Sequence, residues 1–291
     1  MAAENNTIQI DAILPAEMAL KAEAIGVKKA NLAFWPLFAL SVLAGAFIAL
    51  GSIFATTVSA GSTLPYGVTR LLTGLVFTLG LILVIVGGAE LFTGNNLIIM
   101  AFTSGKVTLK ALLRNWGIVF LGNLVGAVGT AMLMFITRQY SFGGGSIGLN
   151  ALNIANHKTG LEFIQAVALG IMCNALVCLA VWMCYSARTT TDKILSIILP
   201  ISGFVAAGFE HNVANMYFIP MGIFIKDFAP ASFWQTSAIT NAEVNVQNFA
   251  NLTWGNFFIH NLLPVTIGNI IGGAVLVGLV YWFIYLKKWN A

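Results

Sequence analysis

The sequence has very little charge. Only 8% of its 291 residues are Asp, Glu, Lys or Arg, whereas an average soluble domain carries about 25%. With 58% hydrophobic residues, so few charges cannot cover a globule with a solvated surface. The composition therefore excludes an ordinary soluble enzyme, a disordered chain and a nucleic-acid-binding protein, and it indicates an integral membrane protein that contacts the lipid bilayer.

Cysteine is also scarce. Cys173, Cys178 and Cys184 fall in one apolar stretch, and their odd count and clustering argue against a disulfide framework or a zinc site. No nucleotide-binding glycine loop follows a strand pattern, and no nucleophile stands beside a base in a known motif. The sequence predicts no cofactor, no metal site and no enzyme activity.

Long apolar stretches are abundant. Each exceeds the ~20 residues that a helix needs to span hydrocarbon, and together they predict an all-α membrane protein with six transmembrane helices. The stretches lie at 34–59, 70–103, 112–137, 160–187, 194–225 and 257–286.

The chain divides into an N-terminal segment (1–33) and a transmembrane domain (34–291). The first segment has charges and no apolar core, so we expect no cleavable signal peptide. Apolar residues recur at helical spacing between Ile13 and Ala30, with Pro15 placed in a first turn. This pattern predicts a short amphipathic helix, which lies at the membrane surface or forms a solvated tail.

The positive charges predict the orientation. An even number of crossings puts both termini on one side, and with that side cytoplasmic, ten Lys and Arg residues lie inside against four outside, as the positive-inside rule requires. The two long outer connections, 138–159 and 226–256, read as ordinary solvated loops. The inner positives are Lys21, Lys28, Lys29, Lys106, Lys110, Arg114, Arg188, Lys193, Lys287 and Lys288, and the outer ones are Arg70, Arg138, Lys158 and Lys226.

The second and fifth stretches are too long for single straight helices. A helix of ~33 residues reaches ~50 Å against a hydrocarbon core of ~30 Å, which favours a break in each. Both contain a polar, glycine-bearing motif, at 87–96 and 207–215. A shift of 120 residues carries Gly88, Glu90 and Asn95 onto Gly208, Glu210 and Asn215.

The third and sixth stretches match as well, through 122–126 and 268–272, while the first and fourth share a weak register of Gly45 with Gly170. We interpret the chain as two copies of a three-helix unit, 34–137 and 160–286, the second inserted upside down. Inverted repeats with broken helices are typical of a pore or transporter whose site lies where the repeats meet.

The positions of the acidic residues indicate where in the sequence the functional site lies. Of ten Asp and Glu residues, only Glu90 and Glu210 lie inside the broken motifs. A charge in hydrocarbon costs at least ~3 kcal/mol. Such a residue either acts in function directly or serves as scaffold. We favour the scaffold role for both glutamates, each accepting hydrogen bonds from backbone N–H groups freed at its own break. The other residues of this predicted scaffold are Gly94, Asn95, Asn212 and Asn215.

His211 has no counterpart, because Leu91 occupies its position in the other motif. Histidine ordinarily titrates near pH ~6.5 and can switch charge, although a neutral, hydrogen-bonded interior histidine is the alternative. Thr93 lies in the facing break, where it can hydrogen-bond to His211 or to its own helix.

Two further polar residues are candidates. Asn174 either lines a pore or joins helices, and Lys158 either attracts anions at an outer mouth or is an ordinary interfacial lysine. The apolar residues beside the breaks either constrict a pore or pack against lipid and protein. They are Phe77, Leu81, Leu91 and Phe204.

The chain resembles the formate/nitrite transporter family, and most closely its formate-channel branch. The resemblance rests on five blocks spread over most of the length, among which the glutamate–histidine–asparagine block is highly specific. The blocks lie at 64–67, 88–93, 115–116 with 122–126, 209–216 and 264–273.

The resemblance implies an aquaporin-like six-helix protomer, a homopentamer with one pore in each protomer, and passage of small monovalent anions such as formate through an inner membrane. It implies that His211 and Thr93 form the central polar site, and it connects the N-terminal segment with pH-dependent closing. The implied constrictions are Phe77, Leu81, Leu91, Val177 and Phe204, and the implied helpers along the path are Lys158, Asn174 and Glu210.

Two function classes stay open. One is a channel for formate, with nitrite or hydrosulfide as alternatives, and the other is a neutral-solute pore of aquaporin type. The Asn-Pro-Ala boxes of such pores are missing, since Asn95-Asn96 and Asn215-Met216 stand in their places. Desolvating a carboxylate-sized ion costs on the order of 20 kcal/mol in the idealised limit. We expect His211 to lower this cost as a counter-charge or by passing a proton to formate.

Overall fold

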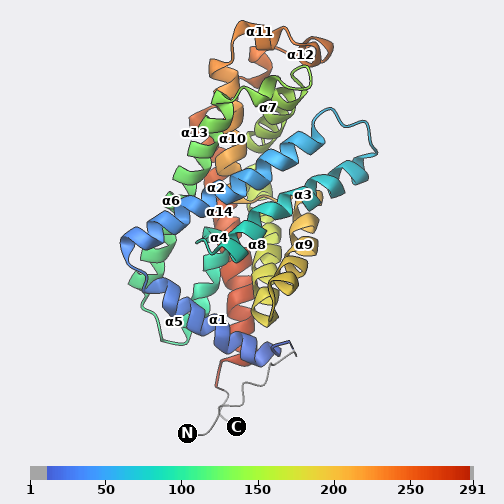
Figure 1. The fold of residues 1–291 in the computed structure, drawn as a ribbon. Coiled ribbons are helices and arrows are strands. Elements are labelled where there is room, and N and C mark those ends of the chain that lie inside the picture. Colours follow the sequence, from blue (N-terminus) through green and yellow to red (C-terminus); the bar gives the residue numbers. More distant parts are fainter. Residues whose placement is uncertain (1–11, 289–291) are drawn as a thin grey trace.

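The computed structural model describes residues 12–288, and every regular element in that range is a helix (Figure 1). Among the described residues, five helices are long and apolar enough to cross a membrane. Four of them are α2 (Phe34–Ser59), α3 (Tyr66–Gly87), α6 (Leu109–Ile136) and α8 (Phe163–Ser186).

The fifth, Val246–Tyr285, is a composite helix. Two of its segments, η4 and η5, have π-helical hydrogen bonding. Its parts are η3 (Val246–Phe249), α13 (Trp254–Asn256), η4 (Phe257–Leu262), α14 (Leu263–Ile270), η5 (Ile271–Leu279) and α15 (Val280–Tyr285).

Both predicted breaks are present. The second apolar stretch consists of α3, then α4 (Phe92–Asn95), η1 (Asn96–Ile98) and α5 (Ile99–Thr103). The fifth stretch consists of α9 (Thr190–Ala206) and α10 (Asn212–Phe228). Each break therefore leaves the end of one helix and the start of another inside the molecule.

A left-handed glycine turns the chain at each break. Gly88 has φ 81° and Gly208 has φ 78°, a conformation that costs any residue with a Cβ atom. Gly94 was predicted to belong to this scaffold, but it lies inside α4 without a positive φ. The left-handed turn is therefore made by Gly88, while Gly94 belongs to the short helix that follows it.

Small residues allow α2 to lie against α6, and α8 against α14 and η5. A Cβ atom on Gly126 would lie 2.0 Å from the carbonyl oxygen of Val42, and one on Gly272 would lie 2.1 Å from that of Ile171. These two contacts match through a shift of 129 residues between α2 and α8. The predicted register of Gly45 with Gly170 is therefore wrong, and Gly45 corresponds to Asn174.

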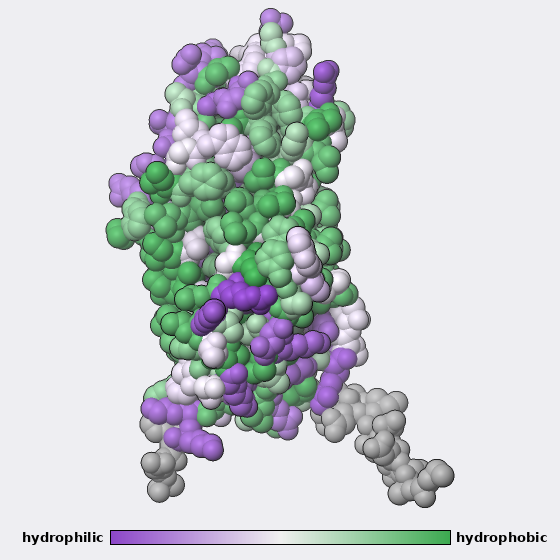
Figure 2. Space-filling model, turned by 90° about the vertical axis from the view of Figure 1, so that its left-hand side faces the viewer, coloured by the Kyte–Doolittle hydropathy of each residue, from purple (hydrophilic) through white to green (hydrophobic). Residues whose placement is uncertain are grey.

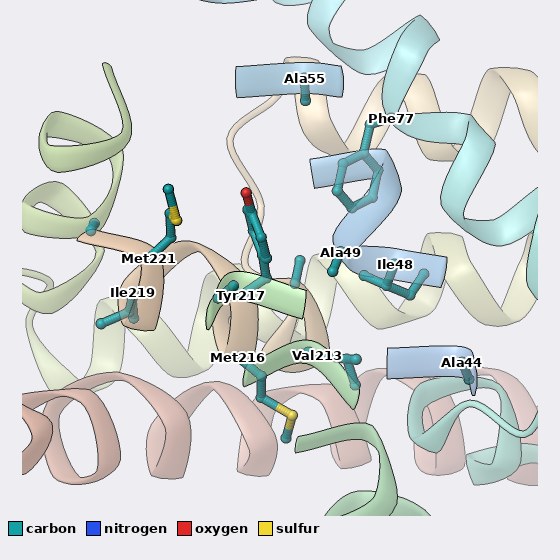
Figure 3. Close-up of a cluster of buried hydrophobic side chains, with 14 of the residues drawn as sticks. Ala44, Ile48, Ala49, Ala55, Phe77, Val213, Met216, Tyr217, Ile219 and Met221 are labelled. Atoms are coloured by element: carbon teal, nitrogen blue, oxygen red, sulfur yellow. The ribbon is translucent and has the colours of Figure 1, made fainter. Parts of the chain in front are cut away.

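The centre of the molecule is a large apolar cluster. In Figure 3, Ala44, Ile48 and Phe77 from α2 and α3 face Val213 and Tyr217 from α10. Hydrophobic side chains also form a broad band on the outer face, between hydrophilic groups gathered toward the two ends (Figure 2). This distribution fits a face that contacts an apolar environment.

The two ends carry additional helices. At one end α1 (Pro15–Ala30) packs on η1 and α5, and at the other lie α7 (Ser146–Thr159), α11 (Ala231–Trp234) and α12 (Ser237–Asn241) (Figure 1). Predicted features of residues 1–11 lie outside the described residues. The prediction of plain loops at 138–159 and 226–256 is wrong, because the first contains η2 (Gln139–Ser141) and α7, which packs on α10.

Candidate functional site

Each break holds a short extended segment that one asparagine secures. Asn123 on α6 accepts from the N–H of Phe92 (2.9 Å) and donates to the carbonyls of Glu90 (3.0 Å) and Ser41 (2.7 Å). The backbone groups freed by the first break are therefore paired by a side chain, as burial requires.

The second break is secured in the same way. Asn269 on α14 accepts from the N–H of Asn212 (3.0 Å) and donates to the carbonyls of Glu210 (2.9 Å) and Gly170 (2.8 Å). The two asparagines thus make corresponding bonds to corresponding residues of the two motifs.

The Glu90 carboxylate lies in a polar cluster of four residues. Oε2 accepts from Lys29 Nζ (3.0 Å) and from Asn95 Nδ2 (2.7 Å). Asn95 also donates to Asn115 Oδ1 (3.0 Å), and Asn115 donates to the carbonyl of Lys29 (3.0 Å). Lys29 comes from α1, so the N-terminal helix supplies the positive charge of this cluster.

The Glu210 carboxylate lies in a matching cluster. It accepts from Lys158 Nζ (2.7 Å) and from Asn215 Nδ2 (2.6 Å). Asn215 donates to Asn261 Oδ1 (2.7 Å), and Asn261 donates to the carbonyl of Lys158 (2.8 Å). Here the lysine comes from α7, which precedes α8 as α1 precedes α2.

The two clusters correct one prediction and differ in some of their contacts. Both carboxylates are paired with lysine and asparagine side chains, so the prediction that they accept from freed backbone N–H groups is wrong. Lys29 also donates to Asn95 Oδ1 (2.9 Å), whereas within residues 12–288 the corresponding Asn215 Oδ1 is buried without a partner.

His211 lies in the second break, as the residue that caps the start of α10. Its Nδ1 accepts from the N–H of Ala214 (3.1 Å) and caps the helix, and its Nε2 lies 3.1 Å from Thr93 Oγ1. The predicted hydrogen bond to Thr93 is therefore present. Because Nδ1 accepts, these partners assign the neutral tautomer with hydrogen on Nε2.

Asn174 connects the two breaks from α8. Its Nδ2 donates to Asn96 Oδ1 (2.8 Å), to the carbonyl of Asn269 (2.6 Å) and, more weakly, to the carbonyl of Thr93 (3.4 Å). The Cys178 thiol also donates to the Thr93 carbonyl (3.3 Å). Asn174 is therefore a buried link that positions Thr93 and lines neither cavity described below.

A cavity of about 350 Å³ opens on the α7 side of His211. Phe77 and Phe204 form its floor with the imidazole: the two phenyl rings meet edge to face at 5.7 Å, and Phe204 stacks on His211 at 5.9 Å. The charged residues of its wall are Arg70, Lys158 and Glu210. Two positive groups face one negative group, a balance that favours anions.

A second cavity, of about 300 Å³, opens on the α1 side. Leu81 and Leu91 form its inner end, and its wall also contains Gly94 and Asn95. Its charged residues are Lys21, Lys29, Lys193 and Glu90. Lys21 donates to the carbonyl of Tyr185 (2.8 Å), and burial, with help from the charges of Lys193 and Arg188, lowers its pKa.

The cavities have no lining residue in common. Of the predicted constriction residues, Phe77 and Phe204 line the first cavity and Leu81 and Leu91 line the second, while the fully buried Thr93 lines neither. Val177 is also buried on α8 but lines neither cavity. The two polar cavities are thus separate, and the apolar side chains at which they end are buried.

Several site residues were not predicted. Lys29, Asn115, Asn123, Asn261 and Asn269 had no predicted role, although each lies at a matching position of the two halves of the sequence. The repeat itself could have identified them, because Lys29 and Lys158 are related by a shift of 129 residues, and Asn115 and Asn261 by a shift of 146. Among the described residues, no group of His, Cys, Asp and Glu could hold a metal ion.

The fold and site define a helical, multi-pass membrane protein with a polar site built on interrupted helices. The family model "Formate/nitrite transporter" matches residues 16–283, and the chain belongs to that family.

Relatives extend over nearly the whole chain. The chain is 49% identical to "Formate channel FocA" of Escherichia coli (strain K12) over 96% of each chain. It is 36% identical to "Probable formate transporter" of Methanothermobacter thermautotrophicus, over 94% of this chain and 97% of that one. Among solved structures, "Pentameric formate channel with formate bound" is similar with a TM-score of 0.81 and 51% identity, covering 87% of this chain and 98% of that one.

Proposed function

We propose that the protein is a channel for formate and related small monovalent anions in the inner membrane, acting as a homopentamer with one pore in each protomer. The observation that carries this proposal is the His211–Thr93 pair, buried in an apolar barrier between two cavities with a positive excess. The relatives named as formate channels and the solved pentamer with formate bound support the same assignment.

The proposed architecture is six membrane crossings in two inverted repeats, related to the aquaporin arrangement. The matched Lys–Glu–Asn–Asn clusters and the matched Asn123 and Asn269 contacts support it. Since Lys29 on α1 corresponds to Lys158 on α7, each repeat begins with an additional helix that precedes its first crossing. The distribution of positive residues supports a cytoplasmic location for α1 and for both termini.

The proposed path runs from the α7-side cavity, past Phe77 and Phe204, along His211 and Thr93, and past Leu81 and Leu91 into the α1-side cavity. Lysines in both cavities attract the anion, and the narrow apolar barrier excludes larger solutes. Glu90 and Glu210 act as scaffold that holds these lysines.

The contacts of His211 favour a neutral hydrogen-bond donor over the counter-charge expected from the sequence. A doubly protonated ring would turn an Nδ1–H toward the N–H of Ala214, and the positive end of the α10 helix dipole also opposes a cation there. Because Nε2–H is directed at Thr93, an anion that enters between the two side chains exchanges this bond for bonds to one N–H and one O–H donor.

The test is passive flux in proteoliposomes that contain the purified protein, with formate, nitrite, hydrosulfide and glycerol measured side by side. We expect formate to pass and glycerol to be excluded. Faster flux of nitrite or hydrosulfide than of formate would reassign the substrate within the family. Glycerol flux equal to that of formate would exclude an anion channel.

A further inference from the structure

The proposed path gives no role to the cation Arg70. It lies near the start of α3, in the wall of the α7-side cavity that also contains Lys158 and His211. A cation near the N-terminal end of its own helix gains nothing from that helix's dipole. Its position is explained by another helix, α9.

The guanidinium caps the end of α9. Nε donates to the carbonyl of Ala206 (3.2 Å), and Nη2 donates to the carbonyl of Val205. These carbonyls belong to the last turn of α9, which ends at the break beside the cavity. The C-terminal end of a helix carries about half a negative charge, and without a cation this end would repel an entering anion.

Arg70 retains donors for a ligand. A guanidinium has five N–H groups in one plane, and the two carbonyls occupy two of them. Within residues 12–288 the other three N–H groups have no partner, and the side chain is only partly buried. A planar carboxylate is the group that such a fork binds best.

We infer that Arg70 is a carboxylate-binding residue of the α7-side cavity, which receives the anion from solution before it reaches Lys158 and His211. This inference rests on the proposed function. The same guanidinium neutralises the end of α9, so a single residue removes a repulsion and adds an attraction at the entrance of the path.

The inference is tested with Arg70→Gln and Arg70→Lys, with Arg138→Gln as the matched control. Arg138 is an exposed cation in the connection before α7 that lines neither cavity. Formate uptake is measured in right-side-out and inside-out membrane vesicles, at low and at high ionic strength, so that each entrance is tested separately.

For entry from the α7 side we expect Arg70→Gln to raise the half-saturating formate concentration about tenfold at low salt, and less at high salt, because salt screens steering charges. Arg70→Lys keeps the charge without the planar fork, and we expect a smaller rise. Entry from the α1 side and the Arg138→Gln control should keep the wild-type half-saturation. A purely structural role would instead lower the flux from both sides alike.

Protection of the wild-type protein supplies a measurement that needs no variant. An impermeant dicarbonyl reagent selective for arginine is added from the α7 side, and modification is located by mass spectrometry. Formate should slow the modification of Arg70 and leave that of Arg138 unchanged. Equal modification with and without formate, or an unchanged half-saturation in Arg70→Gln, would overturn the inference. If the wild-type protein itself carries no formate, the proposed function fails instead.

Discussion

At the scale of single residues, the two glutamates show how a carboxylate is tolerated inside this protein. Each is paired with a lysine and an asparagine, so its charge is compensated by side chains that come from other elements. A scaffold role follows from this pairing, and it predicts that removal of the charge lowers the stability of the protein.

Replacing Glu90 or Glu210 with glutamine leaves a lysine without its counter-charge, which we expect to cost on the order of 2 kcal/mol of stability. Glu210→Gln should be the more damaging change, because the Lys158 and Glu210 side chains are 13% and 4% exposed, against 26% and 10% for Lys29 and Glu90. The measurement is the thermal midpoint of the purified assembly. A variant with normal stability and an altered preference among anions would contradict the scaffold role.

His211 combines two tasks that two substitutions separate. Asparagine can still cap α10 by accepting from Ala214, whereas phenylalanine cannot, and loss of such a cap costs about 1 kcal/mol. Neither side chain reproduces the Nε2–H beside Thr93. We therefore expect formate flux to fall at least tenfold in both His211→Asn and His211→Phe, with the stability lowered only in the second. Flux near the wild-type level in His211→Asn would remove the imidazole from the transport step.

The residue scale also shows what the sequence can and cannot reveal. The pairing of His211 with Thr93 was predictable, because the two breaks face each other once the repeat is recognised. Lys29 was not identified as the partner of Glu90, since 61 residues separate them and only the docking of α1 brings them together. A carboxylate in an apolar stretch thus indicates that polar partners must be present, but the sequence does not show which residues they are.

At the scale of elements, the breaks depend on backbone geometry as well as on side chains. No atom lies within 4 Å of a Cβ placed on Gly88, so Gly88→Ala tests the left-handed turn alone. We expect it to destabilise the protein by about 1–2 kcal/mol. Gly94→Ala is the matched control: its Cβ would lie 3.6 Å from Val181 Cγ2 within an ordinary helix, and it should be neutral. Equal thermal midpoints for the two variants would contradict the assignment of the turn to Gly88.

The prediction of elements was correct where the length of an apolar stretch determines the structure. It failed where tertiary packing determines whether a helix forms. The excess length of the second and fifth stretches located both breaks. The helix α7 was missed because its sequence, rich in Asn and preceded by three consecutive glycines, resembles a loop. Its stability comes from the buried face of Ala151, Leu152 and Ala155. Its position before the fourth stretch matches that of α1 before the first, and this match could have predicted a helix there.

At the scale of the whole molecule, the positive charges predict the topology. Single cysteines in place of Lys106, Arg188 or Lys287 should react with an impermeant reagent from the cytoplasmic side, and a cysteine in place of Lys226 should react from the opposite side. The three native cysteines are buried, so their background labelling should be low. Labelling of all four positions from one side would exclude the six-span arrangement.

The separation of the two cavities has an electrical consequence. Phe77 belongs to one cavity and Leu81 to the other, and on α3 they are about one turn, or ~6 Å, apart. Because water-filled cavities conduct, most of the membrane potential falls across this short barrier. An anion that crosses it bare moves a full elementary charge through the field, which is worth about 2.3 kcal/mol per 100 mV, whereas neutral formic acid feels no voltage. Formate flux recorded against an imposed potential therefore identifies the species that crosses between Phe77 and Leu81: a steep dependence for the anion, and none for the protonated acid.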